Sequence, residues 1–357
     1  MAGFHSTLIP SVTGGCHASN LLRLPGGEIL CAWFGKIQGD SGNIGIWLSR
    51  LQPGSSWTQP KQIAFVNGQN CQNPVLFTAP QTGTLWLFHT AQEVGKQEEA
   101  VLLARISDDN GHTWSEPSYP FGDRRGSLSR QPVRVLDDGT WLLPVFNCAA
   151  TEGQGWKGNN DSSSVLYTRD GGRTWAASDI PDGTGAVHMN IVPRLDASSD
   201  WVAFFRSRWA DNVYRTTSKD GMSWAKPQST SLPNPNCGIA ASRLPNGKPV
   251  IVFNLARADK APASDSEKRE AVWGLPRKTL TVGVSDDDGF TWKHKLLEDF
   301  DDEALQADAL TKGVAGELSY PSITVDDEGV THIAYTFHRK NIKYVRIEDI
   351  ESWISAN

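Results

Sequence analysis

Short apolar runs separated by polar turns recur along the whole chain. The first unit has runs at residues 18–24, 28–34 and 43–49, with a Pro-Gly-Gly turn between the first two. Runs of this length bounded by turn residues predict β-strands joined by hairpins. The same order returns five more times, so the sequence predicts six units. The later units start at Asn73, Gln131, Asn190, Gly238 and Tyr320.

A second pattern marks the turn that follows the third strand of a unit. An Asp can accept hydrogen bonds from backbone N–H groups, a Gly allows a positive φ, and a Trp covers the hairpin. Four copies of this pattern are intact, and a degenerate fifth copy at residues 49–57 keeps the Trp but lacks the Asp. The five tryptophans, at positions 57, 114, 175, 224 and 292, are spaced as expected for four-stranded propeller blades. The intact copies are Ser107–Trp114, Thr168–Trp175, Ser218–Trp224 and Ser285–Trp292.

These patterns predict an all-β fold, a six-bladed β-propeller of four-stranded antiparallel blades. We expect a single domain over residues 1–357, because no Pro/Ser-rich linker interrupts the repeat. The last unit has strands near 330–336 and 342–347 but no Asp turn. Its outer strand is therefore expected to come from residues 4–9, which would close the ring and remove free sheet edges. Helix is expected only at 301–310 and 350–355.

Composition narrows the possible partners. A net charge of -6 without any Lys/Arg-rich run argues against nucleic acid and anionic membranes, and no segment resembles a membrane span. Five cysteines without CxxC spacing are expected to be reduced. The N-terminal residues show no basic region followed by an apolar core, so no secretory signal is visible. The reduced cysteines and the missing signal together predict a cytoplasmic protein, or a secreted one if a signal was removed. We expect no cofactor and no metal, because the histidines lack tight HxH or HxxxH spacing; the oligomeric state stays open.

The inner strands of a propeller run beside its axis, so the residues that open them are expected to converge on one central mouth. Most of these positions hold polar or ionisable groups where a purely structural strand would begin with an apolar residue or Gly. The ring therefore predicts a polar site of the size of a sugar. The residues are Cys16, His17, Gln72, Asn73, Arg130, Gln131, His188, Asn190, Asn236, Cys237, Glu317 and Tyr320.

The Asp turns, the six units and segments such as Gly45–Arg50 and Tyr320–Ile323 resemble the sialidase (neuraminidase) superfamily. Within it, the chain is similar to the divergent branch of predicted neuraminidases with BNR repeats, over essentially its whole length. The resemblance implies a Tyr nucleophile polarised by a Glu, an Asp acid/base and three arginines that clamp a carboxylate. Tyr320 matches the nucleophile, Asp40 the acid/base and Arg277 one clamp arginine.

The chain departs from the superfamily at three positions. The first clamp position holds His17. The second falls near Asn212, with Arg206, Arg208 and Arg215 only nearby. The position of the Glu falls at residues 188–190, where His188 stands. The resemblance therefore implies a site from which most of the carboxylate clamp has gone.

The residues support chemistry in their own right. A phenol with a pKa of about 10 needs a cation or base beside it to react near neutral pH, and His17, His188 and Arg130 are the candidates. Asp40 can protonate a leaving oxygen if a lid raises its pKa, and residues 152–157 are the candidate lid. Either Arg130 or Arg277 can grip one carboxylate. Each residue also has a structural alternative. His17 can hydrogen-bond a backbone carbonyl where the strand begins, Asp40 can form an Asx turn, and the Tyr320 ring can pack as a half-buried side chain.

Three functions remain open. The first is a sialidase-like exo-glycosidase, a glycoside hydrolase that cleaves a terminal acidic or rare sugar from a glycan or oligosaccharide. The second is a lyase that acts by β-elimination on a uronic acid, for instance in a rhamnosyl-glucuronate linkage. The third is a sugar-binding propeller without activity. The expected catalytic residues are Asp40, Tyr320, His17 and His188, and the expected substrate-binding residues are Arg130, Arg277, Asn73, Gln72, Asn190, Asn236, Glu317 and Arg206.

Overall fold

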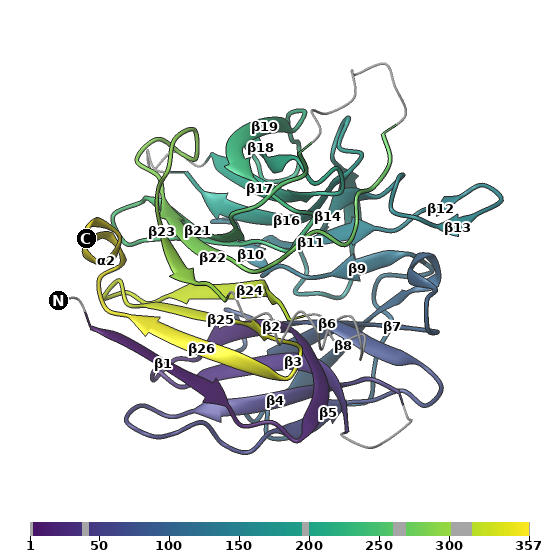
Figure 1. The fold of residues 1–357 in the computed structure, drawn as a ribbon. Coiled ribbons are helices and arrows are strands. Elements are labelled where there is room, and N and C mark those ends of the chain that lie inside the picture. The colour runs from purple at the N-terminus through teal and green to yellow at the C-terminus, as the bar shows by residue number, and fades with distance from the viewer. Residues whose placement is uncertain (1–2, 38–42, 195–199, 260–268, 301–315, 357) are drawn as a thin grey trace.

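Six antiparallel sheets of this protein are arranged around a common axis, and a seventh, two-stranded sheet is a separate hairpin (Figure 1). The computed structural model describes residues 3–37, 43–194, 200–259, 269–300 and 316–356. Each of the six sheets is one blade, and its strands run outward from the axis in chain order, except that the outermost strand of the last blade is formed by residues 4–9. The prediction of an all-β, six-bladed propeller is confirmed.

Blades 1 to 3 are formed by the first half of the chain. Blade 2 has three strands, and an isolated bridge between Ala104 and Ser118 extends it. The inner strand of blade 3 is split into two short pieces. Blade 1 contains β2 (Thr13–Arg23), β3 (Ile29–Ile37), β4 (Gly45–Leu51) and β5 (Lys61–Ala64); blade 2 contains β6 (Asn70–Thr78), β7 (Leu85–Gln92) and β8 (Val101–Ser107); blade 3 contains β9 (Ser127–Ser129), β10 (Arg134–Val135), β11 (Trp141–Asn147), β14 (Ser162–Thr168) and β15 (Ala176–Asp179).

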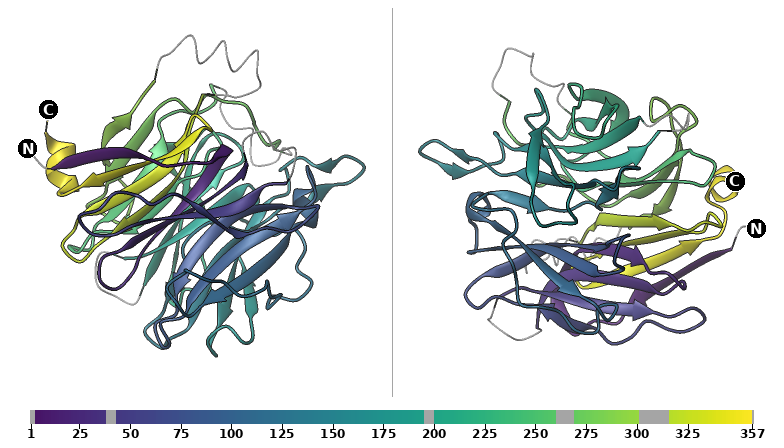
Figure 2. Two further views of the ribbon diagram at one scale, coloured as in Figure 1. Left: turned by 90° about the horizontal axis from the view of Figure 1, so that it is seen from below. Right: turned by 180° about the vertical axis from the view of Figure 1, so that it is seen from behind.

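Blades 4 and 5 repeat the four-stranded order, and blade 6 completes the ring. Blade 4 contains β16 (Ala186–Pro193), β17 (Trp201–Ser207), β18 (Asn212–Ser218) and β19 (Gln228–Pro233); blade 5 contains β20 (Ala240–Arg243), β21 (Pro249–Asn254), β22 (Leu280–Val284) and β23 (Lys293–Glu298); blade 6 contains β24 (Leu318–Val325), β25 (Thr331–Phe337), β26 (Asn341–Ile347) and β1 (Phe4–Ile9). Figure 2 shows the blades from two further directions.

The outer strand of blade 6 comes from the N-terminus. β1 pairs antiparallel with β26, from Phe4 opposite Ile347 to Ile9 opposite Ile342. This pairing gives β26 a neighbour on both sides, so its backbone groups are not left as an open edge. The first and last strands of the chain therefore lie in one sheet.

The Asp turns hold the outer hairpins in the way the sequence indicates. In the copy after β22, the Asp287 carboxylate accepts from the backbone N–H of Thr291 at 2.8 Å and from its hydroxyl at 2.7 Å. The Ser285 hydroxyl accepts from the Gly289 N–H at 2.8 Å, and the Trp292 indole donates to the Gly289 carbonyl at 3.1 Å. Burial raises the pKa of Asp287, but these donors outweigh it and hold that pKa below the usual range.

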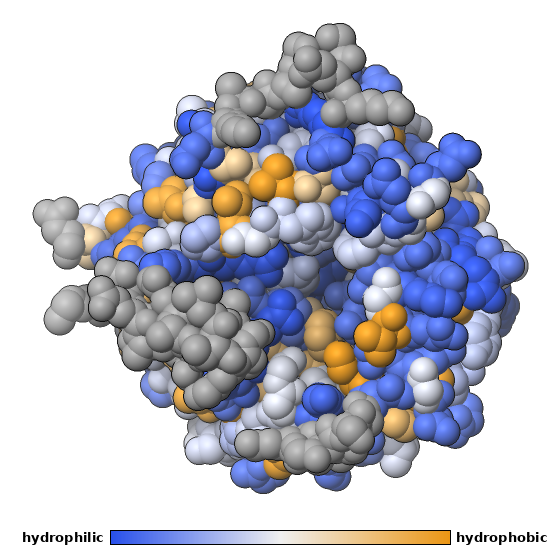
Figure 3. Space-filling view, turned by 45° about the vertical axis from the view of Figure 1, so that its right-hand side comes forward, coloured by the Kyte–Doolittle hydropathy of each residue, from blue (hydrophilic) through white to orange (hydrophobic). Residues whose placement is uncertain are grey.

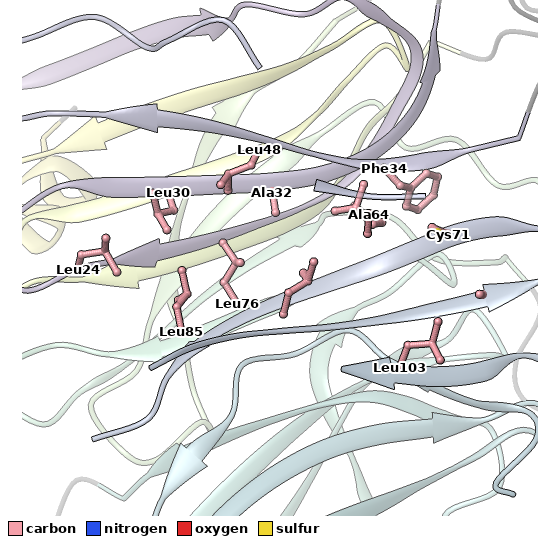
Figure 4. Packing of buried hydrophobic residues seen from close by; sticks show 14 residues of the cluster. Leu24, Leu30, Ala32, Phe34, Leu48, Ala64, Cys71, Leu76, Leu85 and Leu103 are labelled. Carbon is pink, nitrogen blue, oxygen red and sulfur yellow. The ribbon is translucent and has the colours of Figure 1, made fainter. Parts of the chain in front are cut away.

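The hydrophobic core lies between neighbouring blades. Figure 4 shows one such layer, in which Leu30 and Leu48 of blade 1 pack near Leu76 and Leu85 of blade 2. These strands are apolar on the faces that meet the next blade, so each blade is stabilised by its neighbours.

Two short helical segments are described, and one of them is α2 (Ile350–Ser355), where the sequence predicts a helix. Asp349 caps it by accepting from the Ser352 N–H at 3.0 Å. The second is a three-residue 3₁₀ turn, η1 (Gln97–Glu99). The helix expected at 301–310 lies outside the described residues. Within the described part of the chain, neither helix has the length and apolar character that crossing a membrane requires.

Candidate active site

The inner strands are distorted at a common level of the propeller. In five of the blades, one non-glycine residue within or just before the inner strand has a φ between 50° and 56°. The strand register also shifts at four of these places, as expected for β-bulges. A bulge turns side chains out of the regular alternation, and strained backbone of this kind is common at functional sites. The five residues are Ala18, Asn73, His188, Asn236 and Tyr320.

These bulges bring three aromatic side chains from blades 1, 4 and 6 together. The ring of Tyr320 lies 4.1 Å from the ring of His17 and 5.6 Å from the ring of His188, measured between centroids. Gly238 lets the blade 5 strand approach them, because a Cβ built there would lie 3.3 Å from Cγ of Tyr320. Residues more than three hundred positions apart in the sequence therefore form one cluster.

The hydroxyl of Tyr320 is held by a guanidinium. Nη1 of Arg206 donates to this hydroxyl at 2.5 Å, and Nε of Arg206 donates to the Asn236 amide oxygen at 2.7 Å. The guanidinium of Arg277 lies 5.7 Å from the Tyr320 ring centroid. Burial raises the pKa of Tyr320, but Arg206 and then Arg277 outweigh it and lower that pKa below the ordinary value near 10. The site therefore favours the phenolate more than water does.

This contact corrects the expectation about the second clamp position. Asn212 lies on β18, and its amide donates to the Ser229 hydroxyl at 2.9 Å on the outermost strand, β19. Arg206 lies on the neighbouring β17, which pairs with the inner strand. The guanidinium beside the tyrosine thus comes from Arg206, which the sequence analysis placed only near the clamp position.

The two histidines of the cluster are buried and uncharged. Burial lowers the pKa of His17 well below its usual range, and the cations Arg339 and Arg277 add to the effect. Burial followed by Arg206 does the same for His188. Nδ1 of His188 is buried without a hydrogen-bond partner among the described atoms. A neutral imidazole can accept a proton through its free ring nitrogen, and burial beside the arginines makes both rings weak bases.

A carboxylate stands behind His17. Glu317 lies 3.6 Å from Nδ1 of His17, and the Thr336 hydroxyl lies 2.9 Å from the same nitrogen. Glu317 also accepts from Nη1 of Arg277 at 2.9 Å and from Nε of Arg339. Burial raises its pKa, but Arg339 and Arg277 outweigh burial and lower it, so the group is ionised. Glu317 therefore holds Arg277 and Arg339 in place and lies beside the Nδ1 edge of the His17 ring.

The cluster opens into a cavity of about 190 Å³, and Figure 3 shows a mainly hydrophilic hollow near the middle of one face of the molecule. Among the described residues, a larger cavity of about 770 Å³ lies elsewhere, between the outer strands of blades 1 and 6 beside Trp57 and Tyr344, and no residue of the cluster lines it. Chemistry therefore belongs to the smaller cavity. The residues that line it are His17, Phe34, Gln72, Asn73, Gln97, Phe146, Cys148, Trp156, His188, Arg208, Trp273, Tyr320 and Arg339.

One wall of the cavity is aromatic. The hairpin of β12 (Ala150–Thr151) and β13 (Gly155–Trp156) projects from blade 3 in Figure 1 and carries Trp156. The Trp156 ring meets the Trp273 ring edge-on at 5.5 Å, and the Arg208 guanidinium lies 4.9 Å from the centre of Trp273. Asp161 binds the buried Arg208 at 2.7 Å. The residues expected to form a lid thus place one indole at the mouth.

The structure separates the expected substrate-binding residues into two groups. Gln72 and Asn73 line the cavity, whereas Arg206, Asn236, Arg277 and Glu317 form the shell that holds Tyr320 and His17. The expectation for the other two is corrected, because interior contacts occupy their side chains. Arg130 donates to the backbone carbonyls of Ser19, Tyr320 and Pro321, and Asn190 bonds the His188 carbonyl and the Ala241 N–H. Asp40 lies outside the described residues.

Sequence reasoning assigned no role in the site to Asp161, Arg208, Trp273 or Arg339, nor to the cavity-lining residues Phe34, Gln97, Phe146 and Cys148. Arg208 lies two positions after Arg206, a spacing that places both side chains on one face of an extended segment. This spacing was the one available signal. Trp273 lies in an irregular segment whose Val272 N–H donates to the Arg208 carbonyl at 2.8 Å. Nothing in the local sequence marks Asp161 or Arg339. Within the described ranges, no group of three or more His, Cys, Asp or Glu side chains could hold a metal ion.

Comparison with known proteins identifies the family. The BNR repeat-like domain family matches residues 27–333. A sialidase from Paraclostridium sordellii is 31% identical over 105 residues, which cover 26% of this chain and only 24% of that protein.

Solved structures share the fold at low sequence identity. A protein of unknown function from Dyadobacter fermentans superposes with a TM-score of 0.72 at 15% identity, covering 98% of this chain and 100% of that one. The intramolecular trans-sialidase from Ruminococcus gnavus, in complex with oseltamivir carboxylate, gives a TM-score of 0.69 at 11% identity over 96% of this chain and 97% of that one. This chain therefore belongs to the BNR repeat-like domain family, and it shares the propeller fold of the solved trans-sialidase.

Proposed function

We propose that this protein is a carbohydrate-active enzyme that releases a terminal acidic sugar from a glycan, with Tyr320 as the reacting group. The observation that carries the proposal is the hydrogen bond from Arg206 to the Tyr320 hydroxyl. A buried phenol beside a fixed cation has a lowered pKa, which is how proteins activate a tyrosine for nucleophilic or proton-transfer chemistry. Tyr320 also lines the central cavity, where a sugar ring can reach it.

The first candidate reaction is hydrolysis through a covalent intermediate. The Tyr320 oxygen attacks the anomeric carbon, the bond from this carbon to the leaving oxygen breaks, and the leaving oxygen takes a proton. The proposed donor is Asp40, a role that rests on the resemblance alone. Water then attacks the same carbon and gives its proton to the Asp40 carboxylate, while Tyr320 departs as a phenolate. Arg206 and Arg277 stabilise that phenolate in both steps.

The second candidate is β-elimination on a uronic acid, and the two histidines favour it. Among the described residues, no carboxylate hydrogen-bonds the Tyr320 hydroxyl, whereas neutral His17 and His188 flank its ring. One imidazole takes the proton from C5, a double bond forms between C4 and C5, and the bond from C4 to the leaving oxygen breaks. The Tyr320 hydroxyl gives its proton to that oxygen. A rhamnosyl-glucuronate linkage is a substrate of this kind.

One experiment tests the proposal and separates the reactions. The protein is incubated in ¹⁸O-labelled water with oligosaccharides that end in sialic acid and with others that contain glucuronate, and the products are analysed by mass spectrometry and near-ultraviolet absorbance. Hydrolysis places one ¹⁸O in the released sugar. Elimination places none and produces an absorbing unsaturated uronate.

The matched variants are Tyr320→Phe and Tyr119→Phe, since Tyr119 is 64% exposed and lies outside the cavity. We expect Tyr320→Phe to lose turnover and Tyr119→Phe to keep it. Glycan binding without turnover by the unmodified protein, across the whole panel, would instead indicate a sugar-binding propeller. Full activity of Tyr320→Phe would remove the proposed role of this residue.

A further inference from the structure

Arg339 reaches the cavity from a strained turn. It lies between β25 and β26, where His338 has a φ of 54° and Arg339 a φ of 57°. The Lys340 N–H closes the turn by donating to the Phe337 carbonyl at 3.1 Å. Two successive positive φ values are typical of a type I′ hairpin turn, in which Asn and Gly are the usual residues. Two bulky residues held in this conformation beside a cavity suggest a function for one of them.

The guanidinium of Arg339 is anchored at one end only. Its Nε donates to Glu317, and within the described part of the chain its two terminal nitrogens have no hydrogen-bond acceptor. The side chain is 35% exposed and lines the cavity together with His17 and Tyr320. A guanidinium held through Nε presents both terminal nitrogens in one direction, which is the geometry that grips a carboxylate with two parallel bonds.

The charges around Glu317 leave room for one more anion. Glu317 carries one negative charge and is shared between Arg277 and Arg339, which carry two positive charges. His17 is neutral and adds none, although the resemblance places a clamp arginine at its position. The pair of arginines therefore retains about one unit of positive charge beside the cavity. A single carboxylate would balance it.

From this geometry we propose that Arg339 binds the carboxylate of the acidic sugar and so supplies, from blade 6, the cation that His17 does not provide in blade 1. Glu317 is the positioning residue that holds Arg339 for this contact. The inference rests on the proposed function, because it assigns the anion-binding side of the same cavity. It makes the recognised ligand an anionic monosaccharide unit, and the neutral counterpart of that sugar is bound without this contact.

Direct binding tests the inference without requiring turnover. Trp156 and Trp273 line the cavity, so tryptophan fluorescence reports on its occupancy. The probes are D-glucuronate and N-acetylneuraminate, with D-glucose as the neutral comparison. We expect Arg339→Met to bind the acids roughly 10- to 100-fold more weakly, since one charge-assisted contact is lost, and to bind glucose as the unmodified protein does. Arg339→Lys should fall between them, because an ammonium keeps the charge without the bidentate fork.

The control is Lys340→Met, which removes a charge from the exposed neighbouring residue of the same turn and should leave every affinity unchanged. Arg339→Met with unchanged affinity for the acids, in a protein that prefers them to glucose, overturns this inference and leaves the proposed function standing. An unmodified protein that binds the acids no better than glucose overturns both. Where Arg339→Met fails to fold, Arg339→Lys decides: weakened acid binding supports the inference, and unchanged binding refutes it.

Discussion

Replacing Arg206 with methionine should raise the pKa of Tyr320. Methionine fills much of the same space but removes the guanidinium that donates to the Tyr320 hydroxyl at 2.5 Å. Burial, the largest influence on this hydroxyl, disfavours the phenolate and remains in the variant. Because Arg277 stays 5.7 Å from the ring centroid, part of the favourable charge is kept.

The size of the effect follows from the charge that is lost. An opposite charge within about 4–6 Å typically shifts a pKa by roughly 1–3 units, and each unit corresponds to about 1.4 kcal/mol. We therefore expect the pKa of Tyr320 to rise in Arg206→Met, with a loss of about 1.4–4 kcal/mol of phenolate stabilisation.

The assay is a spectrophotometric titration of the tyrosinate band, with the signal of Tyr320 obtained by subtracting the titration of Tyr320→Phe. Arg215→Met is the matched control, because Arg215 lies in the same blade but its guanidinium packs on Phe290 and donates to the Asp288 carbonyl at 2.8 Å. This control should leave the titration of Tyr320 unchanged. An Arg206→Met protein in which the pKa of Tyr320 does not rise would refute the electrostatic account of the site.

The same variant separates the two proposed reactions through the pH dependence of kcat/KM. In hydrolysis Tyr320 must be deprotonated to attack, so activity rises as pH passes through its pKa, and Arg206→Met moves that rise to higher pH. In elimination Tyr320 must hold its proton, so activity falls as pH passes through its pKa, and the variant moves that fall to higher pH. If the rise of kcat/KM with pH shifts in the variant, the reaction is hydrolysis; if the fall shifts, the reaction is elimination.

Three further predictions concern stability. Gly172→Ala should destabilise the protein by about 1–3 kcal/mol more than Gly171→Ala in chemical unfolding, because both have positive φ but only the new Cβ at 172 meets an indole ring, at 2.9 Å; equal losses would contradict this. Asp161→Asn should cost about 3–5 kcal/mol by leaving a buried guanidinium unpaired, and adding Arg208→Met should restore part of it; no recovery would argue against the ion pair as the cause. Burial acts to raise the pKa of Asp220, but hydrogen-bond donors in its turn lower that pKa from 3.8 to about 2. Its contribution to stability is therefore complete above pH 3.8 and is lost as pH falls toward 2. The melting temperature of Asp220→Asn should fall less across this interval than that of the unmodified protein, and parallel curves of melting temperature against pH would refute this.

The blades could be predicted because their signals are local. Each Asp turn holds its donors, its Gly and its Trp within eight residues, so one short segment specifies one hairpin and the spacing of the copies gives the number of blades. The β-strand alternation then requires no long-range information. The α2 helix was also expected from the sequence, and the structure adds that Asp349 caps it by accepting from the Ser352 N–H.

The site could be predicted only in part, because it depends on bulges and on contacts between blades. No glycine marks the bulges at His188 and Tyr320, so their positive φ values were not foreseen. Counting along blade 4 placed an arginine position near Asn212, whereas the paired strands bring Arg206 to the tyrosine. Arg130 was expected to face a substrate, but carbonyl groups from two other segments occupy it. Such competition between ligand and backbone appears only in three dimensions.

The pairing of β1 with β26 has a consequence for synthesis of the protein. Residues 4–9 leave the ribosome more than three hundred residues before their partner at 342–347, so this strand stays unpaired while the blades between them are synthesised. Figures 1 and 2 show the two chain ends close to each other as a result. Deleting residues 4–9 would leave β26 as an unpaired edge that can pair with a strand of another molecule. A circular permutation that joins residue 357 to residue 1 and opens the chain in a surface loop should preserve the ring.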